Sequence, residues 1–239
     1  MYQLHDLSRV YRKGRGTVAA LRDVNLDIED GEFITIQGLT GHGKSTLLMT
    51  LGAMDRPTSG SILFDGQNLG GLPESRLTDV RGRSFGFIFQ SYNLMPTLTA
   101  AENVEVALVP LHVPAAQRRS RALAALAEVG LDERAGFFPP ELSGGEQQRV
   151  GIARALVKEP KVILADEPTG NLDETTRTEI VGIMERLWKD RGLSLIVVTH
   201  DSSLARRAPR TALLDRGRLS VRSNAPQPEP TPAPPAGSS

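Results

Sequence analysis

A glycine-rich segment with one lysine and two hydroxyl residues is the strongest chemical signal in the sequence. Residues 38–46 read GLTGHGKST and fit the G-x-x-x-x-G-K-[ST] pattern. A strand is expected over 32–37 and a helical run follows from 44. Glycines let such a backbone turn tightly, so that successive N–H groups point inward at a helix N-terminus. The segment therefore predicts a phosphate-binding loop.

The residues of this loop have different expected roles. Lys44 can place a positive charge on the β- and γ-phosphates of a nucleotide, Ser45 offers an oxygen ligand for Mg²⁺, and Thr46 offers a further donor. For His42 we expect the backbone N–H, and not the side chain, to contact the phosphates. The other expected phosphate contacts are Gly38, Leu39, Thr40, Gly41 and Gly43.

Three further polar residues stand where apolar runs end. Asp166 and Glu167 follow the run VILA, and His200 follows LIVVT. Parallel strands present their carboxyl ends at the ligand crevice. We expect Asp166 to hold Mg²⁺ through water and Glu167 to orient or deprotonate an attacking water. A lone histidine is more often structural, but its strand-end position favours a catalytic role for His200.

A second helix start, LSGGEQQR at 142–149, has an unusual composition. Ser143 and Glu146 form a capping-box pattern, yet Gly144 and Gly145 occupy the first turn. Glycine costs roughly 1 kcal/mol against alanine inside a helix. Bare N–H groups at a positive dipole end can bind an anion. We interpret this turn as a cap for a nucleotide held by another copy of the chain; a flexible turn before a helix is the alternative.

The remaining pattern alternates short apolar runs with helical segments. The N-terminal third is mostly of strand type, with runs at 24–28, 32–37 and 60–64. Helical patterns cover 117–130, with Leu123, Leu126 and Val129 as its apolar stripe, and 175–190. Runs at 161–167 and 193–200 indicate buried parallel strands. A strand pair is expected around Arg216-Gly217, and the proline-rich tail from 224 is expected to be disordered.

Composition excludes several classes of protein. Lys plus Arg number 28, as do Asp plus Glu. The chain therefore lacks the excess of basic residues that would predict a nucleic-acid partner. The chain has no cysteine, which excludes disulfides and thiolate zinc sites. Its apolar runs are too short to span a bilayer, and no signal-peptide pattern opens the sequence. We expect a cytoplasmic protein that reaches a membrane only through a partner.

Together, the motifs and their order resemble those of ATP-binding cassette (ABC) ATPases. LSGGEQQR resembles the family's signature motif, and LADEPTGNLD its Walker B motif and D-loop. The resemblance covers about residues 1–222. DRPTSG and FIFQSYNLMPTLTAAENV are similar to the nucleotide-binding subunits of lipoprotein-releasing and macrolide-export systems. The phosphate loop departs slightly, because Leu39, Thr40 and His42 replace the more usual Pro, Ser and Ser.

The resemblance implies further roles for individual residues. Tyr11 resembles the aromatic that stacks on adenine, with an ordinary strand tyrosine as the alternative. Gln90 resembles the Q-loop glutamine that touches Mg²⁺, and His200 the switch histidine near the γ-phosphate. Residues 91–100 look like the surface that docks a transmembrane subunit. The residues implied to contact ATP across a dimer are Ser143, Gly144, Gly145, Gln147 and Asp173.

The resemblance also implies the architecture. It predicts an α/β protein with a P-loop NTPase (RecA-like) core, an N-terminal antiparallel β subdomain and an inserted α-helical signature subdomain. The expected parts are 1–90 for the β subdomain and first part of the core, 91–160 for the helical subdomain, 161–222 for the second part of the core, and 223–239 for the tail.

The implied activity is ATP hydrolysis with Mg²⁺, by a dimer that works on a separate transmembrane permease. The chain would then sit at the inner face of the cell membrane. A regulator of a membrane partner, as in cell-division ABC complexes, is equally compatible with the sequence. A soluble DNA-repair or ribosome-acting ATPase is disfavoured, because there is no second cassette, no long coiled coil and no basic excess.

Overall fold

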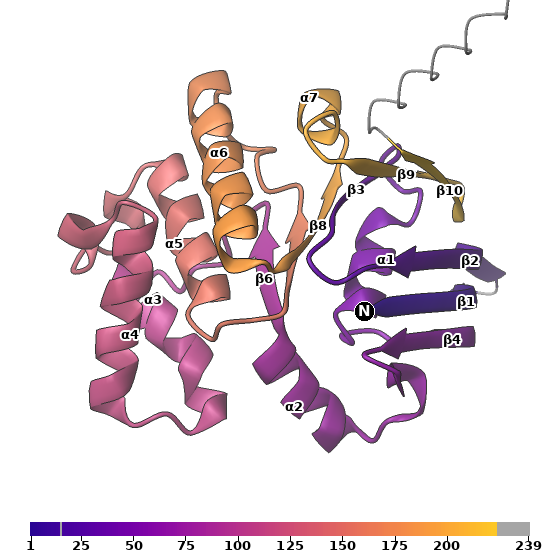
Figure 1. Cartoon of the computed structure of the whole chain (residues 1–239), viewed down its shortest axis with the longest axis horizontal. Helices are drawn as coiled ribbons and strands as arrows, with labels where there is room; N and C mark the ends of the chain where they lie inside the picture. The colour runs from indigo at the N-terminus through magenta and orange to yellow at the C-terminus, as the bar shows by residue number, and fades with distance from the viewer. Residues whose placement is uncertain (15, 224–239) are drawn as a thin grey trace, which may run out of the picture.

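The computed structural model describes residues 1–14 and 16–223, which form two sheets with helices packed on and between them (Figure 1). The strands are β1 (Tyr2–Lys13), β2 (Gly16–Ile28), β3 (Phe33–Gln37), β4 (Ser59–Phe64), β5 (Gln67–Asn68), β6 (Phe85–Phe89), β7 (Val162–Asp166), β8 (Ser194–Thr199), β9 (Arg210–Asp215) and β10 (Arg218–Ser223). The α-helices are α1 (Lys44–Leu51), α2 (Glu74–Ser84), α3 (Ala100–Glu105), α4 (Ala115–Glu128), α5 (Gly144–Leu156), α6 (Glu174–Arg191) and α7 (Ser202–Ala205). The expected disordered tail lies outside the described residues from 224 onward, and Ser223 closes β10.

The larger sheet supplies the strand ends on which the predicted site depends. Its order is β10-β9-β3-β8-β7-β6, and β9, β3, β8, β7 and β6 run parallel. Residues of β8 alternate between two cores, with Leu195 and Val197 in one and Ile196 and Val198 in the other. Both faces of the strand are therefore buried, which explains its unbroken apolar run and confirms the parallel-strand prediction.

The second sheet is antiparallel, with the order β2-β1-β4-β5. Helix α1 packs between this sheet and the larger one, since Leu47, Leu48 and Leu51 share a core with strands of both. Helices α3, α4 and α5 gather at the opposite end of the molecule (Figure 1). The structure thus has the α/β architecture that the sequence predicts.

Two details of the helices differ from the sequence prediction. Leu126 and Val129 are buried as predicted, but Leu123 of α4 is 39% exposed, and Ala122 and Ala125 complete the buried stripe. Small residues fill that face because α4 packs closely against α3 and α5. Helix α2 was not expected, because its polar sequence buries only Leu77. Within the described residues, no helix combines the length and the apolar character that a bilayer crossing requires.

Candidate functional site

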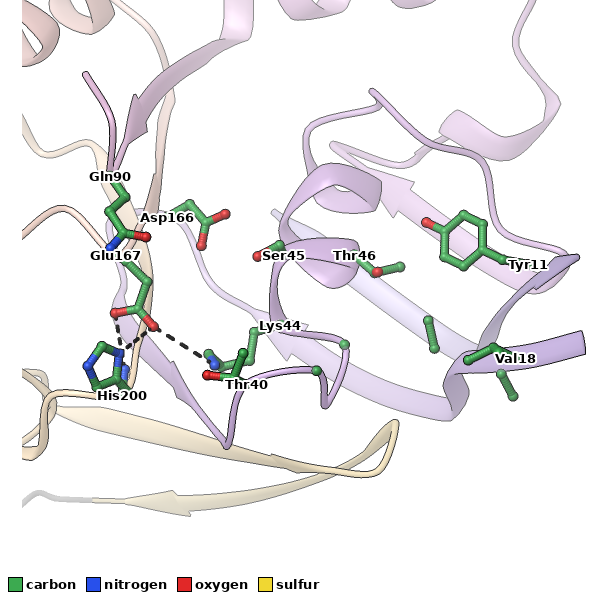
Figure 2. Close-up of a pocket in the computed structure, with 14 residues that line it drawn as sticks. Tyr11, Val18, Thr40, Lys44, Ser45, Thr46, Gln90, Asp166, Glu167 and His200 are labelled. Atoms are coloured by element: carbon green, nitrogen blue, oxygen red, sulfur yellow. Dashed lines mark hydrogen bonds and ion pairs between the residues drawn. The ribbon is translucent and has the colours of Figure 1, made fainter. Parts of the chain in front are cut away.

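One cleft of about 480 Å³ opens beside the phosphate loop (Figure 2). Its lining residues come from the two sheets and from the loops that follow β3, β6, β7 and β8. The predicted site residues that line it are Tyr11, Thr40, Gly41, Gly43, Lys44, Ser45, Thr46, Gln90, Asp166, Glu167 and His200. Segments far apart in the sequence thus converge on one cavity, as the strand-end argument predicts.

The side chain of Lys44 is bound by the phosphate loop itself. The Lys44 Nζ donates to the carbonyl oxygens of Gly38 at 2.8 Å and Leu39 at 3.3 Å, and it lies 3.9 Å from Glu167 Oε1. Gly43 begins α1 with φ of 100°, and a Cβ there would overlap the Ala20 carbonyl oxygen. Only glycine fits that conformation at that distance. Two carbonyl oxygens of the loop therefore hold the Lys44 ammonium in place beside Glu167.

Three predicted phosphate contacts do not line the cleft. Gly38 and Leu39 contribute carbonyl oxygens to Lys44, and Leu39 points its side chain to solvent. His42 faces the β9–β10 turn, where its Nδ1 lies 3.1 Å from Asp215 Oδ1 and accepts from the Arg216 N–H at 3.3 Å. These residues shape and anchor the loop, and their direct contact with phosphate stays a prediction.

Glu167 and His200 form a pair at the inner end of the cleft. The His200 Nδ1 lies 2.8 Å from Glu167 Oε1, and the His200 backbone N–H donates to Glu167 Oε2 at 3.2 Å (Figure 2). Glu167 adopts φ of 45°, which is costly for a residue with a Cβ. Its N–H donates to Val198 O at 2.9 Å, which helps to hold this conformation. The strained backbone therefore aims the carboxylate into the cleft.

Asp166 and Ser45 lie together in the same cleft. Burial raises the pKa of Asp166; the Ser45 hydroxyl, which hydrogen-bonds to its carboxylate, opposes that shift, and the charge of Glu167 adds to it. The side-chain Nε2 of Gln90 donates to Asn171 Oδ1 at 3.2 Å, so the side-chain oxygen Oε1 is the atom left for a ligand. These oxygens are hard donors of the kind that Mg²⁺ prefers.

The opposite end of the cleft is less polar. Tyr11 lies beside Val18 across the β1–β2 pair, and Val18, Ala19 and Ala20 line the cavity. The Arg9 guanidinium covers one face of the Tyr11 ring at 4.4 Å, and the Tyr11 hydroxyl bonds to Asp55. These β2 residues were not among the predicted site residues, because only the strand register places their side chains in the cleft.

The residues predicted to act across a dimer lie outside this cleft. Ser143 caps α5 in the expected capping box, and Asp173 caps α6 by accepting from the Thr176 N–H at 3.0 Å. Gln147 donates to Leu142 O at 3.0 Å. A Cβ on Gly145 would overlap Thr176 Cγ2, so packing within one chain already requires that glycine. Their contact with a second copy's nucleotide stays a prediction.

The fold and the cleft together define a nucleotide-binding α/β protein with a phosphate loop. The family model described as ABC transporter matches residues 21–170. The chain belongs to the ABC transporter family.

Relatives and solved structures agree with this assignment. The lipoprotein-releasing system ATP-binding protein LolD of Geobacter metallireducens is 45% identical over 92% of this chain and 97% of its own length. The macrolide export ATP-binding/permease protein MacB of Rhodopseudomonas palustris is 48% identical over 90% of this chain, which spans 33% of that relative. A dimeric ATP-binding cassette, solved in a post-hydrolysis state with ADP and phosphate, superposes with a TM-score of 0.88 at 39% identity, over 95% of this chain and 100% of that one.

Proposed function

We propose that this chain binds MgATP in the cleft and hydrolyses it to ADP and phosphate, as the nucleotide-binding subunit of an ABC transporter. The observation that carries the proposal is the convergence of Lys44, Asp166, Glu167 and His200 on one cavity beside a phosphate loop. Phosphoryl transfer needs positioning and charge stabilisation more than covalent chemistry. This arrangement offers both.

Each residue then has one task. Lys44 and the loop N–H groups stabilise charge on the phosphates. Glu167 orients the attacking water and accepts a proton from it. His200 holds the Glu167 carboxylate in place. Tyr11 offers its free face to the adenine ring.

The metal proposal rests on the chemistry of the donors. Ser45, Gln90 and Asp166 would hold Mg²⁺, which neutralises charge on the β- and γ-phosphates when bound. Burial that raises the pKa of Asp166 marks a carboxylate whose negative charge lacks a sufficient partner in the chain alone. A divalent cation would supply that partner.

We further propose that two copies close around ATP, with the Ser143–Gly145 turn, Gln147 and Asp173 of one copy completing the site of the other. The dimeric state of the superposed cassette supports this. A transmembrane permease would use the closure, with residues 91–100 as its docking surface and the chain at the inner face of the membrane. The names of the relatives favour transport over the regulatory alternative. The division at residues 90, 160 and 222 is part of the same proposal.

Lys44→Ala tests the site. Removing this buried ammonium should lower the ATPase turnover number by about 10²–10³-fold, the usual loss for one preorganised charge-stabilising group. Lys189→Ala removes an exposed lysine of α6 and should leave turnover unchanged. ATP hydrolysis by a folded Lys44→Ala protein at the rate of the Lys189→Ala control would contradict the proposal.

A further inference from the structure

The turn that follows Gln90 lies along helix α5. Tyr92 and Asn93 adopt φ of 60° and 49°, two consecutive left-handed residues that both carry side chains. Such backbone costs of order 1–3 kcal/mol for a residue such as tyrosine, and less for asparagine, and it persists where the surroundings hold it. In this structure the contacts that hold the turn come from helix α5.

Arg154, in the last turn of α5, is the residue that holds it. Its Nη1 donates to Asn93 O at 2.5 Å and its Nη2 donates to Tyr92 O at 2.7 Å. The planar guanidinium carries two terminal NH₂ groups, so each of the two adjacent carbonyl oxygens has a donor of its own in a fixed geometry. The side chain is half-buried, and burial lowers its pKa. One side chain of α5 therefore binds the carbonyl groups of both left-handed residues of the turn.

Tyr92 also reaches the other end of the same helix. A Cβ built on Gly144 would lie 2.9 Å from the Tyr92 hydroxyl oxygen, so the ring covers the first turn of α5. A Cβ on Gly151 would lie 3.9 Å from the Tyr92 carbonyl oxygen. The turn thus contacts α5 near its start, middle and end. This packing also gives a reason within one chain for glycine at position 144.

We propose that Arg154 and Tyr92 join the turn after Gln90 to α5 as one mechanical unit, so that a force on the turn moves Ser143, Gly144 and Gly145. We class Arg154 as a positioning residue, because its two hydrogen bonds go to the turn and it is not among the residues that line the nucleotide cleft. The inference rests on the proposed function for what applies the force and for what the Ser143–Gly145 turn binds. It adds a connection from the docking segment to the dimer face that does not pass through Gln90.

Hydrogen exchange on the nucleotide-free full chain tests the connection. Arg154→Met removes both donors and should speed exchange roughly tenfold in peptides covering 91–95 and also in those covering 143–147, as expected for losing one or two local hydrogen bonds. Tyr92→Asn keeps a residue that tolerates left-handed backbone but removes the ring. It should speed exchange over 143–147 alone.

Arg121→Met is the matched control. Arg121 also donates to a backbone carbonyl, Val157 O at 2.9 Å, but does not touch the turn. Arg121→Met should therefore leave the exchange rates of the peptides covering 91–95 and 143–147 unchanged. The inference is overturned if Arg154→Met speeds exchange over 91–95 but leaves 143–147 as in the wild type, or if Arg121→Met has the same effect on 143–147.

ATPase kinetics separate this inference from the proposed function. Arg154→Met should lower kcat roughly tenfold with an unchanged KM for ATP, and Arg154→Lys should recover part of the rate. A fall in KM and kcat together with a lower melting temperature would indicate a merely structural role and contradict the inference. If the wild-type chain shows no ATPase activity, the proposed function fails, and the exchange result still decides the connection.

Discussion

The His200 Nδ1 lies 2.8 Å from Glu167 Oε1, and the His200 backbone N–H donates to the second oxygen of the same carboxylate. The histidine therefore holds the proposed base from two directions. His200→Ala removes one of the two contacts, and the carboxylate loses its orientation. We expect kcat to fall by about 10²-fold or more, the usual share of a positioned acid–base group. The affinity for MgATP should change little.

Steady-state ATPase assays and nucleotide titration by fluorescence check this prediction. His5→Ala, on the exposed face of β1, is the control and should keep the wild-type rate. Wild-type turnover in His200→Ala, or an equal loss in affinity and in kcat, would show that the pair does not serve the chemical step.

We expect the Asp166 carboxylate to be needed for hydrolysis and to lower the free energy of unfolding at neutral pH. Burial raises its pKa above the ordinary value of about 3.9, so the folded state binds this proton more tightly than the unfolded chain does. The associated stability is present at low pH and is lost as the pH rises through the folded-state pKa. Asp166→Asn should therefore raise the melting temperature of the nucleotide-free protein at neutral pH while it abolishes Mg²⁺-dependent hydrolysis.

Melting curves between about pH 7.5 and about pH 4.5 measure this effect, and the advantage of Asp166→Asn should shrink as the pH falls toward the ordinary carboxyl pKa. Asp79→Asn, an exposed change on α2, controls for the loss of a surface charge. A lower melting temperature for Asp166→Asn at neutral pH would mean that the carboxylate stabilises the fold and that burial does not raise its pKa.

Gly145 should be required by packing against α6. A methyl group there would overlap Thr176 Cγ2, and Gly145→Ala should cost about 1–3 kcal/mol of unfolding free energy. Thr176→Ser removes Cγ2 and keeps the hydroxyl that bonds to Asp173, so the double variant should recover most of the loss. Urea unfolding of the nucleotide-free chain gives these values.

Gly182→Ala is the matched control, because it makes the same change inside α6 with no neighbour within 4 Å. It should stabilise the protein by roughly 0.5–1 kcal/mol, the ordinary gain of alanine over glycine in a helix. If Gly145→Ala is as stable as wild type, the close contact of α5 with α6 does not restrict position 145, and a ligand remains as the reason for glycine there.

The sequence allowed the strand ends and the phosphate loop to be predicted because each carries a local signal. The β7 and β8 runs are apolar on both faces, and Asp166, Glu167 and His200 follow directly from where those runs stop. Helix α2 had no such signal, since only Leu77 is buried. Leu123 shows a related limit, because helical spacing alone did not indicate that Ala122 and Ala125, and not Leu123, lie beside Leu126 on the buried face of α4.

Contacts set by strand register could not be predicted from the residues. Val18, Ala19 and Ala20 enter the cleft only because β1 and β2 pair with Tyr11 opposite Val18. The turn of His42 toward Asp215 depends on the β9–β10 hairpin, whose Arg216 bonds to His42 across 174 residues of the chain. The glycines at 144 and 145 likewise have packing partners, Tyr92 and Thr176, that no local pattern indicates.

We propose that ATP joins two copies of this chain and that hydrolysis releases them. Glu167→Gln keeps the shape of the side chain and removes the proposed base, so MgATP should accumulate unhydrolysed at the interface. Adding Ser143→Arg places a long side chain at the exposed N-cap of α5, where it should block the partner's nucleotide. Loss of the capping bond from the Glu146 N–H should cost about 1 kcal/mol and leave the core folded.

Size-exclusion chromatography with light scattering, with and without saturating MgATP, measures both effects. We expect Glu167→Gln to be monomeric alone and dimeric with MgATP, and Glu167→Gln with Ser143→Arg to stay monomeric in both conditions while it still binds the nucleotide. A Glu167→Gln protein that binds MgATP but remains monomeric, or a double variant that dimerises as well as the single one, would show that ATP does not join two copies through the Ser143–Gly145 turn.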